Sequence, residues 1–451
     1  MKILHYFLGF PPYRTGGMTK FAYDLMLSQK VYGHEVIAIW PGKINVINSK
    51  TKIEIDKEKR KDDILSYEIV NPLPVPLDEG VRNISLFMKK CNKDIYMSFL
   101  EKICPDVIHI HTLMGLHSEF IESAKELKIR TVYTTHDYFG ICPKVTLFRN
   151  NMACAYDNDC KYCVKCNENA LSFNEIKILQ SHMYKKLKNT RIVKLLRKKH
   201  RSNFFICDNQ EESRISDNAE EKAGKEYIKL RKYYINMLEN IDIIHYNSQL
   251  TKEVYSKYFT PKESKVVTLS HKDIIDNRKS INWKYSGQLK LTYLGPLKNY
   301  KGFGIIKTAL DELISEGKHN FILNMYAEIN NPSSYMKIIK EGYSYEELPQ
   351  IMKNSDIVLV PSVCYETFGY TVLESLSYGV PVIVSENVGA KEIVSDGGIV
   401  IKANSVEELK EVIKSLDKEK LLELHKNVIN DIKIKTFEEF TKEMENLYKG
   451  K

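Results

Sequence analysis

Two glutamates in one short segment are spaced for an elongated ligand. Glu366 follows an apolar stretch predicted to be a strand, and Glu374 comes eight residues later within a predicted helix. At ~1.5 Å of rise per residue, their separation is roughly 12 Å. The two carboxylates can therefore bind hydroxyl groups at opposite ends of one ligand, such as a sugar and a ribose. The alternative is that Glu366 only caps the helix and Glu374 lies on a solvated face.

The residues that begin this helix can also contribute to binding. The first turn of a helix carries backbone N–H groups without intrahelical partners, and its dipole favours negative charge. We therefore expect this segment to bind phosphate or sugar hydroxyls. It consists of Thr367, Phe368, Gly369 and Tyr370.

Glycines and lysines supply two further candidate contacts to an anionic ligand. Gly16 and Gly17 precede a predicted helix and allow the backbone to approach a ligand closely. Lys301 begins another predicted helix after a strand, and Lys298 lies just before it. The alternatives are an ordinary strand–helix turn for the glycines and solvated surface positions for the lysines.

Alternating strands and helices must position these residues. Short continuous apolar runs alternate with amphipathic helices, which is typical of parallel sheets covered on both faces. The expected strands of the first series are residues 2–8, 34–40, 106–111, 131–135 and 241–246. Those of the second series are residues 289–294, 321–326, 356–361, 380–385 and 398–402.

The two series predict two doubly wound Rossmann-like domains of the α/β class that face each other across a cleft. The first comprises residues 1–270, with a cysteine-rich and basic insertion at about 140–240. The second comprises residues 271–435, and its first polar residues, 271–288, are expected to be a linker. Residues 436–451 form a final helix that is expected to pack back on the first domain.

The sequence resembles the retaining glycosyltransferases of GT-B family 4. The Glu366-x7-Glu374 pair matches the paired-glutamate motif of that family, and the following Gly379-Val-Pro381 matches its Gly-x-Pro. Other similar segments are residues 11–17, 33–36, 105–111 and 135–137. The resemblance covers most of the chain outside the insertion, and the matching segments follow the order of the family.

The resemblance implies a role for each candidate residue. Glu366 would position the transferred sugar, and Glu374 would hold the ribose hydroxyls. His136 would lie near the C6 hydroxyl of the sugar at the reaction centre, with a core histidine bonded to backbone as the alternative. The loop of Gly16 and Gly17 would face the donor diphosphate and the acceptor entrance.

Three further positions bear on the donor site. Tyr343 lies in a segment similar to the base-binding turn of the family, where it would stack on a nucleobase or simply pack. The family has an arginine where this chain has Pro296, so one expected diphosphate contact is absent. Lys298 can replace its charge but not its bidentate geometry.

His109 and His111 are expected to be mainly structural, with only one of them facing the cleft.

Five cysteines lie close together in the insertion. Cys160, Cys163 and Cys166 have a knuckle-like spacing that suits tetrahedral zinc. Some members of the family carry a similar insertion, and by that pattern the quartet would be Cys142, Cys154, Cys163 and Cys166, with Cys160 left over. The alternatives are an iron–sulfur cluster and reduced thiols without a ligand. No cofactor is expected for catalysis.

A basic amphipathic segment lies downstream of these cysteines. Residues 185–201 include nine lysines and arginines and no acidic residue. Ile176, Leu179, Met183 and Leu187 are spaced to form an apolar stripe on one helix. Residues 176–201 could therefore bind an anionic membrane surface, or could form a solvated surface helix.

Composition excludes several classes of protein. The chain has 451 residues, 43% hydrophobic and 28% charged, and a net charge of +9. This composition argues against disorder, and no apolar run reaches the ~18 residues of a spanning helix. Nine cysteines are too few for a disulfide scaffold, so a reducing cytoplasm is expected. A peripheral position at the inner face of the membrane is the variant that the basic segment suggests.

The expected function is therefore metal-independent, retaining transfer of a sugar from a nucleotide-diphosphate sugar, with UDP-sugar favoured. The expected acceptor is a hydroxyl of a glycan or lipid-linked acceptor in bacterial surface polysaccharide synthesis. One alternative is a GT-B relative that isomerises or phosphorolyses nucleotide sugars. The other is a zinc-containing nucleic-acid-binding protein, which would leave the paired glutamates unexplained, so no nucleic-acid partner is expected.

Overall fold

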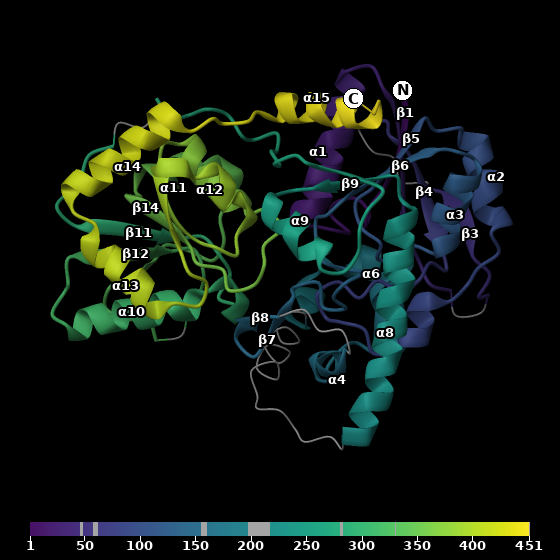
Figure 1. The fold of residues 1–451 in the computed structure, drawn as a ribbon, viewed down its shortest axis with the longest axis horizontal. Helices are drawn as coiled ribbons and strands as arrows, with labels where there is room; N and C mark the ends of the chain where they lie inside the picture. The colour runs from purple at the N-terminus through teal and green to yellow at the C-terminus, as the bar shows by residue number, and fades with distance from the viewer. Residues whose placement is uncertain are drawn as a thin grey trace.

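The computed structural model describes residues 1–45, 48–56, 62–154, 160–196, 217–279, 283–329 and 331–450. It contains two α/β units, each built on its own sheet (Figure 1). This architecture confirms the predicted α/β class with two doubly wound domains.

The N-terminal domain contains an eight-stranded sheet in the order β10-β9-β6-β5-β1-β2-β4-β3. All neighbouring strands are parallel except β3, which pairs antiparallel with β4. The chain order reverses between β1 and β5, and ligands of such sheets bind beyond the carboxyl ends of the strands at this point. The strands are β1 (Lys2–Tyr6), β2 (Glu35–Pro41), β3 (Lys52–Ile55), β4 (Leu65–Val70), β5 (Val107–Ile110), β6 (Arg130–Thr134), β9 (Ile243–Tyr246) and β10 (Glu263–Val266).

The C-terminal domain contains a six-stranded, fully parallel sheet in the order β13-β12-β11-β14-β15-β16. Its chain order reverses between β11 and β14, so the loops after these strands meet at one edge. The strands are β11 (Leu289–Tyr293), β12 (Phe321–Met325), β13 (Met336–Ile338), β14 (Ile357–Val360), β15 (Val382–Ser385) and β16 (Gly398–Ile401).

Helices connect the strands in both domains. Those of the N-terminal domain are α1 (Gly17–Val31), α2 (Asp94–Ile103), α3 (Ser118–Glu126), α8 (Asp217–Asn240) and α9 (Gln249–Ser256). Those of the C-terminal domain are α10 (Phe303–Ser315), α11 (Leu348–Lys353), α12 (Tyr370–Ser377), α13 (Val406–Ser415) and α14 (Lys418–Asp431). The expected strands and helices formed, whereas β3, β4, β10, β13, α2, α8 and α14 were not anticipated.

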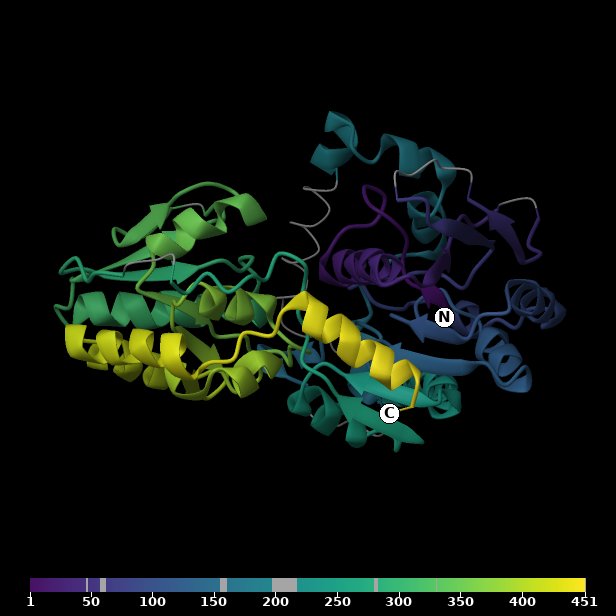
Figure 2. The same ribbon diagram turned by 90° about the horizontal axis from the view of Figure 1, so that it is seen from above.

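The last helix, α15 (Phe437–Tyr448), returns to the N-terminal domain, as the yellow helix in Figure 2 shows. The Phe440 ring packs on Phe21 of α1 with ring centroids 5.3 Å apart. Thr441 forms a hydrogen bond of 3.0 Å with Ser28 of α1. One buried apolar cluster continues from these residues into the C-terminal domain, so α15 joins the cores of both domains.

The insertion contains a two-stranded hairpin and short helices. They are β7 (Phe148–Arg149), β8 (Met152–Ala153), α4 (Lys161–Cys166), α5 (Phe173–Leu179) and α6 (His182–Leu187). The prediction of one continuous apolar stripe was wrong, because the helix breaks between α5 and α6. Ile176 is buried in the core, whereas Met183 and Leu187 are exposed.

The basic run of the insertion is only partly described. Lys188 is buried and donates to the backbone carbonyls of Pro12 and Tyr13 at 3.1 and 2.6 Å. It therefore fixes the loop before α1 instead of facing solvent. Arg197, Lys198, Lys199 and Arg201 lie outside the described residues. Within the described ranges, the helices are too short or too polar to cross a bilayer.

Candidate functional site

Glu366 lies in the loop after β14 and is held by the backbone of the next loop. Its N–H donates to the Asn387 carbonyl at 2.8 Å, and its carbonyl accepts from the Gly389 N–H at 3.0 Å. Its side chain forms an ion pair of 2.9 Å with Lys301 and accepts a hydrogen bond from the Ser362 hydroxyl. The carboxylate is therefore fixed in position and paired with a cation.

Lys301 supplies the positive charge on this side of the site. Burial lowers the pKa of its ammonium group, but the attraction of Glu366 outweighs this effect, so the pKa is raised. Lys301 is consequently charged at neutral pH, and an anion at this position would compete with Glu366 for it.

Lys298 has different partners. Its ammonium group donates to the Tyr300 hydroxyl at 2.8 Å and lies 3.5 Å from Asp78 of the N-terminal domain. The structure therefore places Lys301, but not Lys298, in contact with Glu366.

The start of α12 contacts the N-terminal domain. The Thr367 hydroxyl donates to the His136 carbonyl at 3.1 Å. Its own carbonyl accepts from the hydroxyls of Ser248 and Thr251, both at 2.9 Å. Phe368 is buried in the core. The residues after Glu366 thus form part of the boundary between the two domains.

Gly369 caps α12 and has φ of 102°. A Cβ at this position would lie 2.7 Å from Cγ1 of Val388, so both conformation and space require glycine. Glycine lets the chain enter α12 directly beside Glu366, which leaves the first turn of the helix next to the carboxylate.

Glu374 lies deeper, with its side chain only 3% exposed. Its Oε1 atom is 3.3 Å from Nε2 of His271, and Tyr345 and Tyr370 pack on the His271 ring at 5.2 and 5.3 Å between centroids. The separation fits an ion pair, but the geometry is not that of a hydrogen bond. Nε2 of His271 and the Tyr370 hydroxyl are buried without hydrogen-bond partners among the described residues.

Tyrosines surround Glu374. Burial, followed by the negative charge of Glu374, raises the pKa of the Tyr343 and Tyr370 hydroxyls, which therefore stay protonated and can donate. Tyr343 packs edge-on against Tyr326 at 6.0 Å and belongs to the margin of the core. The pocket around Glu374 consequently offers an acceptor carboxylate beside protonated hydroxyl donors.

The glycine loop lies opposite α12. Gly16 caps α1 with φ of 122°, and a Cβ on Gly17 would lie 3.7 Å from the Tyr370 ring. Lys20 in the first turn of α1 pairs with Asp273 at 2.8 Å and lies 4.9 Å from the Tyr345 ring. The glycine loop of the N-terminal domain and the start of α12 therefore meet at the domain boundary.

His136 follows β6 at the same boundary. Its ring packs against Phe21 at 4.7 Å, and its Nε2 lies 3.1 Å from Nδ1 of His111. Burial lowers the pKa of His136 to about 3, so the ring is neutral. A neutral histidine here can exchange hydrogen bonds with a ligand but does not supply positive charge.

His5, His109 and His111 form a buried group behind His136. Their ligand atoms lie within 4.8 Å of one another, close enough to hold a metal ion. All six ring nitrogens are already engaged in hydrogen bonds, which favours a polar network over a metal site. The expectation that only one of His109 and His111 faces the cleft side was wrong, because residues two apart on a strand share a face; their rings lie 4.0 Å apart.

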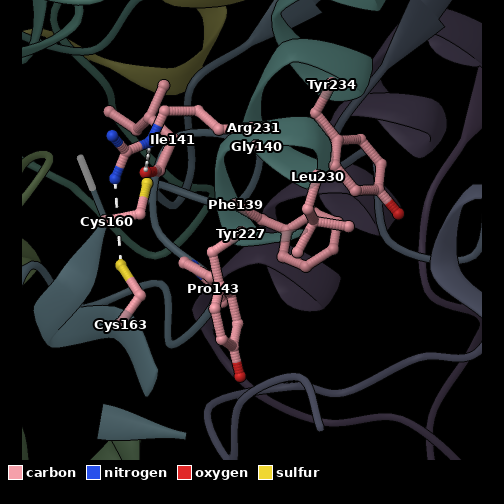
Figure 3. A pocket seen from close by; sticks show the side chains of 10 residues that line it. All are labelled: Phe139, Gly140, Ile141, Pro143, Cys160, Cys163, Tyr227, Leu230, Arg231 and Tyr234. Atoms are coloured by element: carbon pink, nitrogen blue, oxygen red, sulfur yellow. Dashed lines mark hydrogen bonds between the residues drawn. The ribbon is translucent and has the colours of Figure 1, made fainter. Parts of the chain in front are cut away.

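The cysteines of the insertion gather in one region. Cys142, Cys154, Cys163 and Cys166 line one small cavity, and all described cysteines are free of disulfides. An adjoining cavity has Cys160, Cys163 and Arg231 on one side and aromatic side chains on the other (Figure 3). The Arg231 guanidinium lies 3.9 Å from the Cys163 sulfur. No three sulfurs of the described cysteines lie within 4.8 Å of one another.

Sequence reasoning missed several residues of the site. His271 was placed in a linker, yet it is buried against Glu374. Ser362 binds Glu366 from the end of the same loop, and Tyr345 covers His271. The polar residues around His271 led to the prediction of a linker. The available signal for a buried position was its place at the end of a segment of β-prone residues.

Comparison with known proteins identifies the fold. The Anabaena protein Alr3699/HepE, solved in complex with UDP and glucose, is similar over 100% of both chains, with a TM-score of 0.55 and 13% sequence identity. The protein has the GT-B fold. In this GT-B chain, residues 275–434 match the sequence model of the family described as glycosyl transferases group 1.

Curated relatives of the GT-B chain are similar over part of its length. The uncharacterized glycosyltransferase MJ1607 of Methanocaldococcus jannaschii is 28% identical over 185 residues, 36% of this chain and 46% of that protein. The uncharacterized glycosyltransferase MJ1069 of the same organism is 25% identical over 255 residues, 53% of this chain and 64% of that protein. The chain therefore spans about half the length of the curated relatives it matches.

The buried histidines predict a specific acid sensitivity. Burial lowers the pKa of His5 and His245 from 6.5 to about 4, and that of His136 to about 3. The neutral forms stabilise the folded state above pH 6.5, and this contribution is lost as the pH falls toward 4. Burial raises the pKa of Asp137 to about 6 and also raises that of Asp356; these two groups act in the opposite direction but are fewer than the buried histidines. We expect the midpoint of thermal unfolding to fall steadily between pH 6.5 and 4.5, before most carboxylates titrate. A constant midpoint over this range would contradict the neutral buried histidines.

Proposed function

We propose that this protein is a retaining glycosyltransferase that transfers a sugar from a nucleotide-diphosphate sugar to a hydroxyl group. We favour a UDP-sugar as donor and a glycan or lipid-linked acceptor of bacterial surface polysaccharide synthesis. The observation that carries the proposal is the Lys301–Glu366 ion pair just before α12. The residues that follow Glu366 contact the other domain, Thr367 at the His136 carbonyl and Tyr370 beside Gly17 of the glycine loop.

The sugar end of the donor is proposed to bind at Glu366. Lys301 would move its interaction from Glu366 to the diphosphate, which frees the carboxylate to accept hydroxyl groups of the transferred sugar. The first N–H groups of α12 and the backbone of Gly16 and Gly17 add further donors for the negative charge. Stabilising the departing diphosphate in this way lowers the barrier to transfer without a metal ion.

The nucleoside end is proposed to bind at Glu374. A ribose has neighbouring hydroxyl groups that can donate to a carboxylate and accept from other donors. Glu374 provides the acceptor, and the unpaired Tyr370 hydroxyl and His271 Nε2 provide buried partners with unmet hydrogen-bonding capacity. Leaving such groups unpaired costs roughly 1–3 kcal/mol each, so a ligand that pairs them gains affinity.

The retaining outcome is the finer part of the proposal. In this scheme the leaving phosphate takes the proton of the acceptor hydroxyl on the face from which it departs. The structure supports this scheme through the cation and amide groups beside the phosphate position. Bound UDP in HepE, which has the same fold, supports UDP as the first nucleotide to test.

Calorimetric titration of the protein with UDP, GDP and ADP, each with EDTA present, tests the donor site. We expect one nucleotide to bind selectively without metal. Loss of a charged hydrogen-bond partner costs about 1.5–3 kcal/mol, so Glu374→Ala should weaken this binding by about 10- to 100-fold. Glu366→Ala should instead not weaken nucleotide binding, because Lys301 is then free to pair with the diphosphate, and should mainly reduce turnover.

Glu423→Ala is the matched control, because Glu423 lies on the surface of α14 and pairs only with Lys420 among the described residues. It should change neither quantity. Absence of nucleotide binding, or the reverse assignment of effects to Glu366 and Glu374, would contradict the proposed site. Nucleotide release without an acceptor hydroxyl would indicate hydrolysis or phosphorolysis, and conversion of the donor without nucleotide release would indicate isomerisation, instead of transfer.

We also propose that the cysteine quartet holds a structural zinc ion. All four sulfurs line one cavity, and the N–H groups of Lys144 and Leu147 face the Cys142 sulfur, as they would for a thiolate ligand. Burial raises the pKa of Cys142 and Cys166, so the empty thiols remain protonated and a metal would have to displace the protons. The side chains must move to bring the sulfurs around one ion, because no three sulfurs of the described cysteines lie within 4.8 Å of one another.

Elemental analysis of the purified protein tests this metal site. We expect about one zinc per chain, because four cysteines complete a tetrahedral structural site. Cys163→Ser should release the metal and lower the unfolding midpoint, whereas Cys104→Ser should do neither, because Cys104 is exposed on a different element. Metal-free protein that unfolds at the same temperature after zinc addition would contradict the proposal.

Finally, we propose that the basic segment contacts an anionic membrane surface. Large apolar side chains are exposed beside basic residues at the end of the insertion, and this combination suits the boundary between headgroups and acyl chains. The exposed apolar residues are Met183, Leu187, Ile192, Leu195 and Leu196.

Sedimentation with lipid vesicles measures this contact. We expect binding to vesicles containing phosphatidylserine and weaker binding to neutral ones. The triple variant Ile192→Ser, Leu195→Ser and Leu196→Ser should reduce binding by at least about tenfold, since each buried aliphatic side chain contributes roughly 1.5–3 kcal/mol. Val31→Ser removes an equally exposed apolar side chain from α1 and should have no effect. Equal affinity for neutral vesicles at low salt would count against the proposal.

A further inference from the structure

A continuous chain of buried hydrogen bonds connects His136 with the C-terminal helix. From Val267, which follows β10, the chain passes through β9, β6 and β5 to Tyr448 of α15. It then passes through α1 and β1 to His111, which bonds His136. Its members are Val267, His245, Thr134, His109, Tyr448, Gln29, His5, His111 and His136. Each member between the two ends takes part in two of these bonds, through two ring or amide atoms or, for Thr134 and Tyr448, through one hydroxyl, so the direction of one bond determines the next.

The backbone carbonyl of Val267 sets the direction at one end. It can only accept, so Nε2 of His245, 2.8 Å away, carries a proton. The low pKa caused by burial keeps His245 neutral, so its Nδ1 is an acceptor. The Thr134 hydroxyl, 2.9 Å away, must donate to it. Having used its proton, Thr134 accepts from Nε2 of His109 at 2.7 Å.

The direction of the hydrogen bonds is fixed in the same way through α15 and α1. Since Nε2 of His109 carries the proton, its Nδ1 accepts from the Tyr448 hydroxyl at 2.7 Å. The Tyr448 oxygen then accepts from the amide Nε2 of Gln29 at 3.0 Å. The other end of that amide is the oxygen, which accepts from Nε2 of His5 at 2.7 Å. The orientation of the Gln29 amide therefore agrees with the direction set at Val267.

The remaining two bonds reach the domain boundary. Nδ1 of His5 accepts from Nε2 of His111 at 3.0 Å. Nδ1 of His111 then accepts from Nε2 of His136 at 3.1 Å. His136 therefore carries its proton on Nε2, and its Nδ1 is an acceptor that no described residue uses.

We propose that Gln29 and Tyr448 are positioning residues that hold His136 in this tautomer, so that its Nδ1 accepts a hydrogen bond from a hydroxyl group of the bound ligand. The ligand part of this inference rests on the proposed function, since a sugar supplies such a hydroxyl. The tautomer itself does not, because the hydrogen-bond chain is complete without any ligand. Tyr448 belongs to α15, so the helix that returns from the C-terminal domain contributes directly to the state of a residue at the site.

Nitrogen NMR of the ligand-free protein, labelled with ¹⁵N at histidine, tests the proposal. Protonated and unprotonated ring nitrogens have well-separated shifts, and the His136→Gln variant identifies the His136 signals among those of 12 histidines. We expect a proton on Nε2 of His136 and an unprotonated Nδ1. A proton on Nδ1 of His136 in the unmodified protein would overturn the proposal.

Tyr448→Phe interrupts the chain at its centre by removing one hydroxyl. We expect a second tautomer of His136 to gain a measurable population, because the direction set at Val267 no longer reaches it. Ser28→Ala is the matched control: Ser28 precedes Gln29 on α1 and bonds Thr441 of α15, outside the chain. It should leave the tautomer unchanged.

The outcomes distinguish the role of the hydrogen-bond chain from the proposed function. If His136 kept a single, unchanged tautomer in Tyr448→Phe, the hydrogen-bond chain would not be what fixes that tautomer. This result would overturn the proposed role of Tyr448 and Gln29. Should that variant fail to fold, Thr134→Val interrupts the chain between β6 and β5 with nearly the same side-chain shape. If His136 has the expected tautomer but the protein binds no nucleotide, the role of the hydrogen-bond chain is supported and only the proposed function is contradicted.

Discussion

The packing of α15 on α1 is the interaction on which the rest of the arrangement depends. The aromatic contact between Phe440 and Phe21 and the hydrogen bond between Thr441 and Ser28 attach the end of the chain to the N-terminal domain. Phe21 also supports the ring of His136. The same helix therefore ties the two domains together, covers the buried histidines and stabilises the wall of the candidate site.

Much of the fold followed from periodicity in the sequence. Continuous apolar runs predicted the central strands of both sheets, and the glycine pair and the glutamate pair predicted where two helices begin. The edge strands β3, β10 and β13 were missed because their exposed, charged residues remove the apolar signal. Helix α2 was missed because Lys93 at its N-cap makes no side-chain capping hydrogen bond and gives no start signal, although Pro105 closely follows its end.

The charged residues of the site could be predicted from the sequence, whereas the residues that hold them in place could not. Glu366 and Lys301 lie in segments with strong local signals, and they do meet. His271 acts through a contact that is distant in the sequence, which a single sequence does not encode as a pattern. Ser362 lies only four residues before Glu366 but belongs to no recognisable motif. The hydrogen-bond chain of the histidines illustrates this limit, because its members come from five strands or strand ends and two helices. Only the parallel order β10-β9-β6-β5-β1 brings them side by side.

The Lys301–Glu366 pair has a consequence for the timing of the proposed reaction. In the ligand-free protein this ion pair is already formed, so a donor must break it and binds less tightly than it would to an isolated lysine. The same competition operates in reverse after transfer. Once the sugar has left, Glu366 can recapture Lys301 and thereby weaken the hold on the nucleotide product. If the proposed function holds, this ion pair lowers the affinity for the donor and in return speeds the release of the nucleotide product.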